Sequence, residues 1–285
     1  MSNNLYISRR RFIKNLFKIG VFAGLSVTAV VYPIKIEPFW IKIKKIYLGN
    51  IFKIKFVFIS DFHYSDVVSE EYLSSVFNLI IKESPEFVLI GGDYITGANS
   101  RYINNLTPIM TPLCRKIKTY GILGNHDYEI FTYFKNRHLD DVHIKISKAL
   151  LNSGMDLLIN DNRTLVFNNN KLTIAGVDDL WAGRTDIKKA LSNTQNNNFK
   201  ILLSHNPDII PSLNSFDDLL VLCGHTHGGQ VYIPFIGSPF APVKHKEYIY
   251  GLKQKDNLKI YTTSGVGYLW PGRFLVRPEV TIFYV

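Results

Sequence analysis

Short apolar runs alternate with amphipathic segments through the first half of the chain. Residues 56–59, 87–90 and 120–123 are apolar apart from one glycine, which is typical of strands buried on both faces of a sheet. Between the first two runs, apolar side chains recur at helical spacing over residues 70–82, and Pro85 follows. This order predicts parallel strands joined by right-handed crossovers, and therefore an α/β fold.

The second half of the chain is richer in strand patterns. Residues 165–167 and 172–174 flank three asparagines at 168–170, which predicts a hairpin. Further strands are expected at residues 201–203 and 219–222 and near 231–233, 248–252, 259–263 and 280–285. The pattern contains no linker or low-complexity segment that would divide this domain.

Basic and apolar residues alternate at 41–44 and again at 53–56. Period 2 predicts two strands, with Gly49 and Asn50 as the turn between them. Two interpretations of the lysines on one face remain open. In the first, the lysines contact anionic lipid headgroups. In the second, they protect a solvated edge strand from pairing with another chain.

The N-terminus has the composition of an export signal. Residues 8–14 read S-R-R-R-F-I-K and precede 14 apolar or small residues at 19–32, fewer than the roughly 20 that a membrane-spanning helix needs. The string resembles the bacterial twin-arginine signal, although a basic flank on an ordinary signal anchor is the alternative. We expect a signal or anchor at 1–34, basic strands at 35–52 and one catalytic domain at 53–285, in a protein that is exported or held at a bacterial membrane.

Charge is distributed unevenly along the 285 residues. The net charge is +10, but residues 1–50 hold nine Lys and Arg against one acidic residue, whereas residues 51–285 hold 24 against 22. A domain this balanced lacks the basic surface that a nucleic acid requires, so no nucleic acid is expected as partner. The two cysteines, Cys114 and Cys223, are far apart and fit buried thiols better than a disulfide framework.

Five polar motifs follow the apolar runs. They comprise Asp61 and His63, Asp93 after two glycines, Asn125 with His126 and Asp127, His205, and His225 with His227. Ligands in open α/β sheets bind outside the carboxyl ends of strands, and each motif stands just past such an end. Asp61 and His63 are two residues apart, so an extended backbone would direct both side chains into one cavity. Carboxylate, amide and imidazole donors suit Mn, Fe, Co, Ni or Zn better than Ca.

These donors predict metal-dependent hydrolysis. Two divalent ions that share a carboxylate can activate water near neutral pH and stabilise a phosphoryl transition state. His126 is the candidate for protonating the leaving oxygen or stabilising the phosphoryl oxygens. Asp127 is expected to hold the His126 imidazole in position, as carboxylates commonly do around metal sites.

The motifs D-x-H, G-D, G-N-H-D, H and G-H-T-H, in this order, resemble the calcineurin-like metallophosphoesterases. The resemblance implies a four-layer α/β/β/α sandwich. It also implies that Asp61, His63 and His227 hold one ion, that Asn125, His205 and His225 hold the other, and that Asp93 bridges them. His126 would be the catalytic histidine. Manganese is the expected metal, with Fe, Zn, Co, Ni or Mg as alternatives.

Wider motifs resemble an exported bacterial phosphodiesterase branch that also contains a UDP-2,3-diacylglucosamine pyrophosphatase of lipid A biosynthesis. They include D-L-W-A-G at 179–183, H-N-P-D at 205–208 and R-P-E-V-T at 277–281. The expected substrate is a phosphodiester or pyrophosphate, and a nucleotide-linked lipid is one candidate. The expected partner is an anionic membrane surface. A phosphomonoesterase and a non-catalytic scaffold on the same fold are the competing hypotheses.

Three residues are candidates for substrate contact. Trp181 could stack on a sugar or base, and Arg184 and Arg273 could pair with phosphate. Alternatively, the tryptophan packs in the protein interior and the arginines lie on the solvated surface. The stretch at 234–242, with Phe235, Ile236 and Phe240, is either an apolar lip over the site or a rigid loop packed on the sheet.

Overall fold

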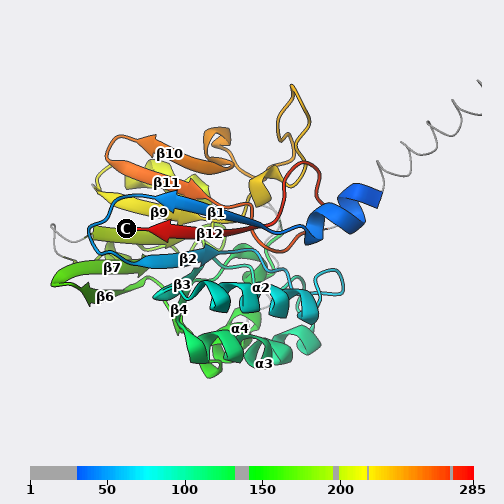
Figure 1. Ribbon diagram of the computed structural model, residues 1–285, viewed down its shortest axis with the longest axis horizontal. Coiled ribbons are helices and arrows are strands. Elements are labelled where there is room, and N and C mark those ends of the chain that lie inside the picture. Colours follow the sequence, from blue (N-terminus) through cyan, green and yellow to red (C-terminus); the bar gives the residue numbers. More distant parts are fainter. Residues whose placement is uncertain (1–30, 132–140, 195–198, 217, 270–271) are drawn as a thin grey trace, which may run out of the picture.

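Two six-stranded sheets stack on each other in this structure, a computed structural model that describes residues 31–131, 141–194, 199–216, 218–269 and 272–285 (Figure 1). The first sheet has the order β1-β12-β2-β3-β4-β5 and the second β10-β11-β9-β8-β7-β6. The strands of the first sheet are β1 (Lys42–Tyr47), β12 (Glu279–Tyr284), β2 (Lys55–Ile59), β3 (Phe87–Ile90), β4 (Lys118–Gly121) and β5 (Asp156–Leu157). Those of the second are β10 (Gly251–Lys255), β11 (Leu258–Thr262), β9 (Leu219–Cys223), β8 (Phe199–Ser204), β7 (Asn170–Gly176) and β6 (Asp161–Phe167).

The central strands of both sheets run parallel, as the crossover pattern predicts. Strands β2 to β5 are parallel to one another, and so are β7, β8, β9 and β11. Strands β6 and β10 add antiparallel edges to the second sheet, whereas β12 lies antiparallel to β2 inside the first. Parallel alignment brings the carboxyl ends of β2, β3, β4, β8 and β9 to one end of the molecule. The candidate metal site lies at that end.

Three apolar clusters separate four layers, which confirms the α/β/β/α arrangement. One lies between the first sheet and the helices α2 (Glu70–Glu83), α3 (Ser100–Lys116) and α4 (Val142–Asn152). A second lies between the sheets, and a third under α5 (Ile187–Ala190) and the 3-10 helix η4 (Pro207–Leu213). After Lys55, strand β2 is apolar because Val57 faces the helices while Phe56 and Phe58 face the other sheet.

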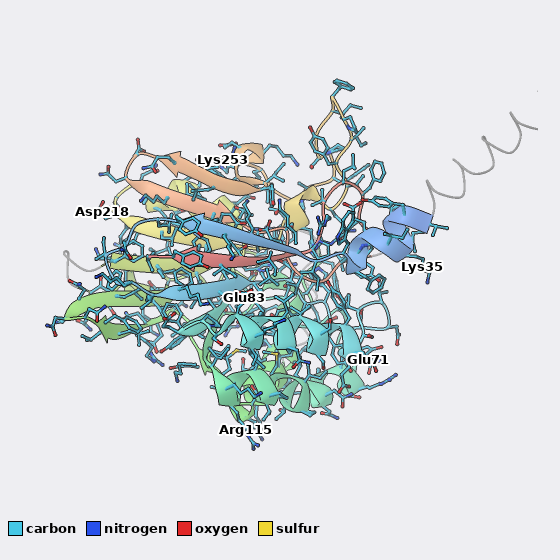
Figure 2. All side chains as sticks on the ribbon, viewed as in Figure 1. Lys35, Glu71, Glu83, Arg115, Asp218 and Lys253 are labelled. Atoms are coloured by element: carbon cyan, nitrogen blue, oxygen red, sulfur yellow. The ribbon has the colours of Figure 1, made fainter. Side chains whose placement is uncertain are left out.

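The predicted helix at 70–82 is α2. Ser69 caps its start by accepting a hydrogen bond from the Tyr72 backbone, and Ser84 ends it in the left-handed conformation. Its apolar face, which includes Leu73 and Ile80, is buried. Figure 2 shows Glu71 and Arg115 on the outward sides of α2 and α3, where both are exposed to solvent.

Most expected strands are present, with three corrections. The hairpin of β6 and β7 is confirmed, and Asn168 and Asn169 make its turn with positive φ angles, a conformation that asparagine tolerates. Residues 231–233 form only isolated bridges, and the strand expected from 248 begins at Gly251, after the 3-10 helix η6 (Lys246–Tyr248). Strands β1 and β2 do not pair across the turn at 49–50, because β12 lies between them.

The N-terminal part of the described chain packs against the domain. Two short helical turns, η1 (Tyr32–Ile36) and η2 (Glu37–Phe39), lead into β1, which pairs with β12. The buried carboxylate of Glu37 accepts a hydrogen bond from the Leu275 backbone at 2.7 Å. No helix within the described ranges has the length and apolarity needed to cross a membrane. The basic string at 8–14 lies outside the described residues.

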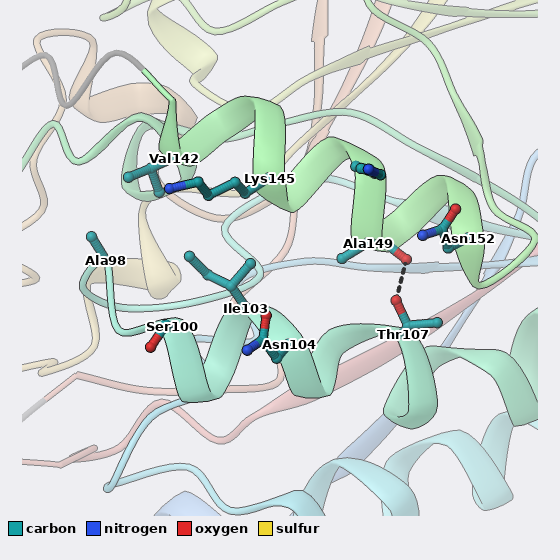
Figure 3. A pocket seen from close by; sticks show the side chains of 10 residues that line it. Ala98, Ser100, Ile103, Asn104, Thr107, Val142, Lys145, Ala149 and Asn152 are labelled. Carbon is teal, nitrogen blue, oxygen red and sulfur yellow. Dashed lines mark hydrogen bonds between the residues drawn. The ribbon is translucent and has the colours of Figure 1, made fainter.

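Helices α3 and α4 border a surface groove of about 320 Å³ (Figure 3). The hydroxyl of Thr107 on α3 donates a hydrogen bond to the Ala149 carbonyl on α4 at 2.8 Å, which ties the two helices together. The described residues that line the groove carry amide, hydroxyl, lysine and aliphatic side chains, and none of them is an imidazole or carboxylate. It therefore lacks the donors of a metal-dependent catalytic site.

Candidate dinuclear metal centre

All seven predicted metal ligands are brought together at the carboxyl ends of five strands. Asp61 and His63 follow β2, Asp93 follows β3 and Asn125 follows β4. His205 follows β8, and His225 and His227 follow β9, with His227 at the start of the 3-10 helix η5 (His227–Gly229). Each of the seven is buried. Loops distant in the sequence therefore meet at one point. His63 and His227 are 164 residues apart, yet their Nε2 atoms lie 2.9 Å from each other.

The backbone at the ligands is not extended. Asp61, His63, Asp93, His225 and His227 all have φ between 50° and 69°, a region that non-glycine residues occupy rarely and at some cost. The expectation that an extended backbone would align Asp61 with His63 is therefore wrong. Tight turns direct these side chains inward instead, and Asp93 helps to hold one of them, because its carbonyl accepts from the His63 backbone at 3.1 Å.

The first group of donors surrounds the predicted position of one ion. Ligand atoms of Asp61, His63 and His227 all lie within 4.8 Å of one another. The Nδ1 atom of His63 is 2.8 Å from the Thr96 hydroxyl, which leaves Nε2 directed at the group. Oxygen Oδ2 of Asp61 is buried without a hydrogen-bond partner. The other oxygen of Asp61, Oδ1, lies 3.7 Å from His227 Nε2. A buried carboxylate beside imidazole nitrogens fits a cation, which would satisfy these groups.

The second group of donors, around the predicted position of the other ion, is arranged in the same way. His205 Nδ1 donates to the Gly91 carbonyl at 2.7 Å, so that Nε2 faces Asp93. His225 Nε2 can donate to the Pro242 carbonyl at 3.2 Å, which leaves Nδ1 free to face the Asn125 oxygen at 2.8 Å. The Asn125 amide nitrogen donates to the Ile130 carbonyl, which turns its oxygen toward the group. Such outer contacts select the nitrogen or oxygen that binds metal.

Asp93 faces both groups. Its Oδ2 lies 3.1 Å from His205 Nε2 and 3.6 Å from His63 Nε2. Its Oδ1 accepts a hydrogen bond from the His126 backbone at 2.9 Å. Gly124 permits this close approach, because a Cβ atom there would lie 2.3 Å from Oδ1. This position suits the predicted bridging carboxylate.

Burial sets the protonation of the ligands in the metal-free site. It lowers the pKa of His225 to about 3 and that of His63 and His227 well below the ordinary value, so these imidazoles are neutral and able to bind metal. Burial also opposes the charge on His205, but Asp93 and Asp61 outweigh it and raise the pKa of His205 to about 10. The proton on His205 thus supplies positive charge that metal ions would replace.

His126 and Asp127 do not form the expected pair. The Asp127 carboxylate accepts hydrogen bonds from the backbone N–H groups of Asp93, Tyr94 and Gly124, at 2.9–3.0 Å, and His126 Nδ1 has no hydrogen-bond partner. Asp127 therefore positions the loops that carry Asp93 and Asn125. The His126 ring instead stands between those of His63 and Phe131, with centroids 4.7 and 4.9 Å away.

The metal centre opens into a cleft of about 510 Å³. His126, Asp93 and Asn125 lie among its lining residues. Large apolar side chains that line it include Phe131, Trp181, Phe240, Pro242 and Leu269, beside the polar Thr226 and Gln230. Phe131 and Leu269 belong to no sequence motif, and only the fold brings them to the site.

The three candidate substrate residues have different positions. Trp181 lines the cleft, with its ring edge-on to His225 at 4.5 Å between centroids. Arg184 is not among the lining residues, and it lies 3.4 Å from Asp178 instead. Arg273 is completely buried, which excludes the expected contact with substrate phosphate. The sequence around Arg273 gives no indication that its side chain is buried.

Arg273 joins two of the ligand loops. Its guanidinium donates to the carbonyls of Ser264, Gly265 and Gly267 and to that of His227. The Gly267 backbone in turn donates to the Asp61 carbonyl at 2.8 Å. Arg273 is thus a positioning residue behind Asp61 and His227.

Replacing Arg273 by lysine is expected to lower the free energy of unfolding of the metal-free protein by roughly 3 kcal/mol, because several buried carbonyl groups would lose their donors. Urea unfolding followed by circular dichroism measures the change. Arg101→Lys, at an exposed position on α3, is the matched control and should change stability little. Equal stability of the two variants would contradict the positioning role.

A buried carboxylate outside the predicted set, Asp179, also lies near the centre. Its Oδ1 accepts from the Ala182 backbone at 2.8 Å, and its Oδ2 has no hydrogen-bond partner. Burial raises the pKa of Asp179 to about 7, although the charge on His205 opposes the shift. The D-L-W-A-G motif contained this residue, but its burial could be seen only in the structure.

The raised pKa of Asp179 predicts a pH dependence of stability in the metal-free protein. The folded state holds this proton more tightly than the unfolded state, whose aspartate pKa is about 3.9. Its stabilising effect is complete below about pH 4 and is lost as the pH rises through 7. Asp179→Asn should therefore lose less stability than the parent protein over that interval in urea unfolding under chelation. Parallel pH profiles of the two proteins would contradict this.

The fold and the ligand set are those of a metal-dependent phosphoester hydrolase. Residues 54–229 match the family model described as calcineurin-like phosphoesterase, and the chain belongs to that family. Membership implies two divalent metal ions, for which the clustered residues provide ligands. The resemblance in the sequence motifs is thereby confirmed.

Relatives of known name match nearly the whole chain. Phosphodiesterase YaeI of Escherichia coli strain K12 is 34% identical, with 97% of this chain and 98% of that protein covered. The uncharacterized metallophosphoesterase YkuE of Bacillus subtilis strain 168 is 31% identical, with 97% of each covered. UDP-2,3-diacylglucosamine pyrophosphatase LpxG of Chlamydia muridarum is 23% identical, with 95% of this chain and 97% of that protein covered.

Proposed function

We propose that this enzyme hydrolyses a phosphodiester or pyrophosphate carried by a membrane lipid. The observation that carries the proposal is the composition of the cleft, where candidate metal ligands and large apolar side chains line the same cavity. A substrate with a phosphate beside acyl or aromatic groups matches both surfaces, because apolar groups gain by leaving water while the phosphate remains at the charged centre. Trp181 is the proposed contact for a sugar or base.

Different residues of this chain have different roles in the proposed reaction. When bound, two divalent ions supply an activated water molecule and stabilise charge on the phosphoryl oxygens. Asp93 holds the His126 backbone through its Oδ1, and His126 lines the cleft. From there it can donate a proton to the leaving oxygen or a hydrogen bond to the phosphoryl group. The apolar residues of the cleft exclude water from this region.

Manganese is the proposed metal, because mixed carboxylate, amide and imidazole donors suit borderline divalent ions. The proposed location is the membrane or its exported side, reached by the twin-arginine route. The basic string at 8–14 and the apolar residues at 19–32 support this location. Relatedness to LpxG makes UDP-2,3-diacylglucosamine one candidate substrate.

Purified, manganese-loaded protein should distinguish the possible reactions. We expect it to hydrolyse bis(p-nitrophenyl) phosphate faster than p-nitrophenyl phosphate, and UDP-2,3-diacylglucosamine in mixed micelles faster than the unacylated UDP-glucosamine. Preference for the monoester would show a phosphomonoesterase instead. Equal rates on acylated and unacylated substrates would refute the lipid assignment while leaving the diesterase intact.

A further inference from the structure

Large apolar side chains are exposed at the end of the molecule where the cleft lies. They belong to two segments, the loop between η5 and η6 and the region where the N-terminal turns meet residues 274–276. We call them the apolar rim, which comprises Ile36, Tyr232, Phe235, Ile236, Phe240 and Leu275. Single exposed apolar residues are ordinary, but a group beside a catalytic cleft marks an interaction surface.

The loop presents its apolar residues on a defined turn. The backbones of Ile233 and Gly237 exchange two hydrogen bonds of 2.8 Å, which close the turn. At its tip Phe235 has a φ of 68° and is fully exposed, and Ile236 is 71% exposed. A phenylalanine held in the left-handed region and directed at water is costly in an isolated protein, so such an outlier suggests a function.

The two parts of the rim are joined by specific contacts. The Tyr232 backbone donates to the Phe274 carbonyl at 2.9 Å, and the Phe274 ring packs edge-on against Tyr32. Leu275 donates its backbone N–H to Glu37. Figure 1 shows the loop, in gold, projecting from the same end of the fold as the blue N-terminal turns.

The chain that precedes the rim indicates what covers it. The apolar stretch at 19–32 leads directly into η1, and three arginines at 9–11 precede it. Exposed lysines flank both parts of the rim, Lys35 on the N-terminal side and Lys244 and Lys246 after the loop; Figure 2 labels Lys35 on the N-terminal turn. Apolar tips flanked along the chain by exposed lysines are complementary to an anionic lipid surface, into which aromatic residues insert at headgroup depth.

We infer that the apolar rim inserts into an anionic bilayer and places the mouth of the catalytic cleft on the membrane surface. Phe240 belongs to both the rim and the cleft wall, so a lipid phosphate can enter the cleft without leaving the bilayer. This inference rests on the proposed lipid substrate and assigns its recognition to the tip residues Phe235 and Ile236, which do not line the cleft.

Fluorescence can test the insertion separately from catalysis. The full chain carrying Phe235→Trp is mixed with vesicles of phosphatidylethanolamine and phosphatidylglycerol whose acyl chains carry bromine. The added fluorescence, relative to the parent protein, should be quenched and shifted to shorter wavelength. Ile144→Trp is the matched control, because Ile144 is an exposed apolar residue on α4, and its fluorescence should stay unquenched. Absent quenching at 235, or equal quenching at both positions, would overturn the inference.

Turnover supplies the second measurement. The double variant Phe235→Ser with Ile236→Ser should hydrolyse the lipid substrate in vesicles about tenfold more slowly, because binding to a bilayer scales with the apolar area inserted, yet keep the parent rate on soluble bis(p-nitrophenyl) phosphate. Unchanged turnover in vesicles would overturn the insertion. Failure of the parent protein on every lipid ester would instead refute the proposed function, and quenching at 235 would still decide the insertion. Shielding of 235 that depends on protein concentration without lipid would identify a second copy as the occupant.

Discussion

Asp93→Asn is expected to reduce turnover of a soluble diester by roughly 1,000-fold or more, because stabilisation of transition-state charge by bound metal is worth several kcal/mol and each 1.36 kcal/mol is tenfold in rate. Among the described residues, Asp93 is the carboxylate that faces His63 and His205 together, at 3.6 and 3.1 Å. The amide removes its negative charge with almost no change of shape, so the second ion should bind weakly or not at all.

Two measurements are needed for this variant, the rate at saturating manganese and the metal content by mass spectrometry. Asp256→Asn provides the matched control. Asp256 lies between β10 and β11 with a φ of 49°, a conformation that asparagine adopts readily, and its loss should affect neither quantity. An Asp93 variant that keeps two ions and a tenth of the parent rate would disprove the bridging role.

His126→Asn is expected to lower kcat by about 10²–10⁴-fold, the range for removal of a general acid or base, while both metal ions stay bound. His126 lines the cleft, and its Nδ1 has no hydrogen-bond partner. Its Asp93 contact runs through the backbone, which the substitution preserves. Burial lowers the pKa of His126, although the charge on Asp93 opposes this effect.

The leaving group separates the two roles open to His126. If the imidazole protonates the leaving oxygen, the loss should be large for an alkyl ester and small for a p-nitrophenyl ester, whose leaving group needs no proton. If it stabilises the phosphoryl oxygens, both esters should lose equally. Loss of a metal ion would contradict both roles and make His126 a ligand, which its proximity to His63 and Asp93 would permit.

Local patterns predicted the elements best where burial is symmetrical. Strands β3 and β9 are apolar along their length, and β2 is apolar after Lys55, because both of their faces are covered. Helix α2 shows one buried stripe. The pattern misplaced elements where partners are distant. Strand β12 enters between β1 and β2 from the far end of the chain, and local alternation carries no information about that neighbour.

The sequence by itself determined the family and supplied the candidate ligands, because residues able to bind metal occur in short motifs after recognisable strands. Only the tertiary structure decided what the residues around them do. It separated Asp127 from the His126 ring and buried Arg273 among carbonyl groups. It also set Phe131 and Trp181 in one cleft. The physical reason is that donor chemistry is a property of each side chain, whereas burial, partner and direction depend on loops that meet only after the two sheets have packed.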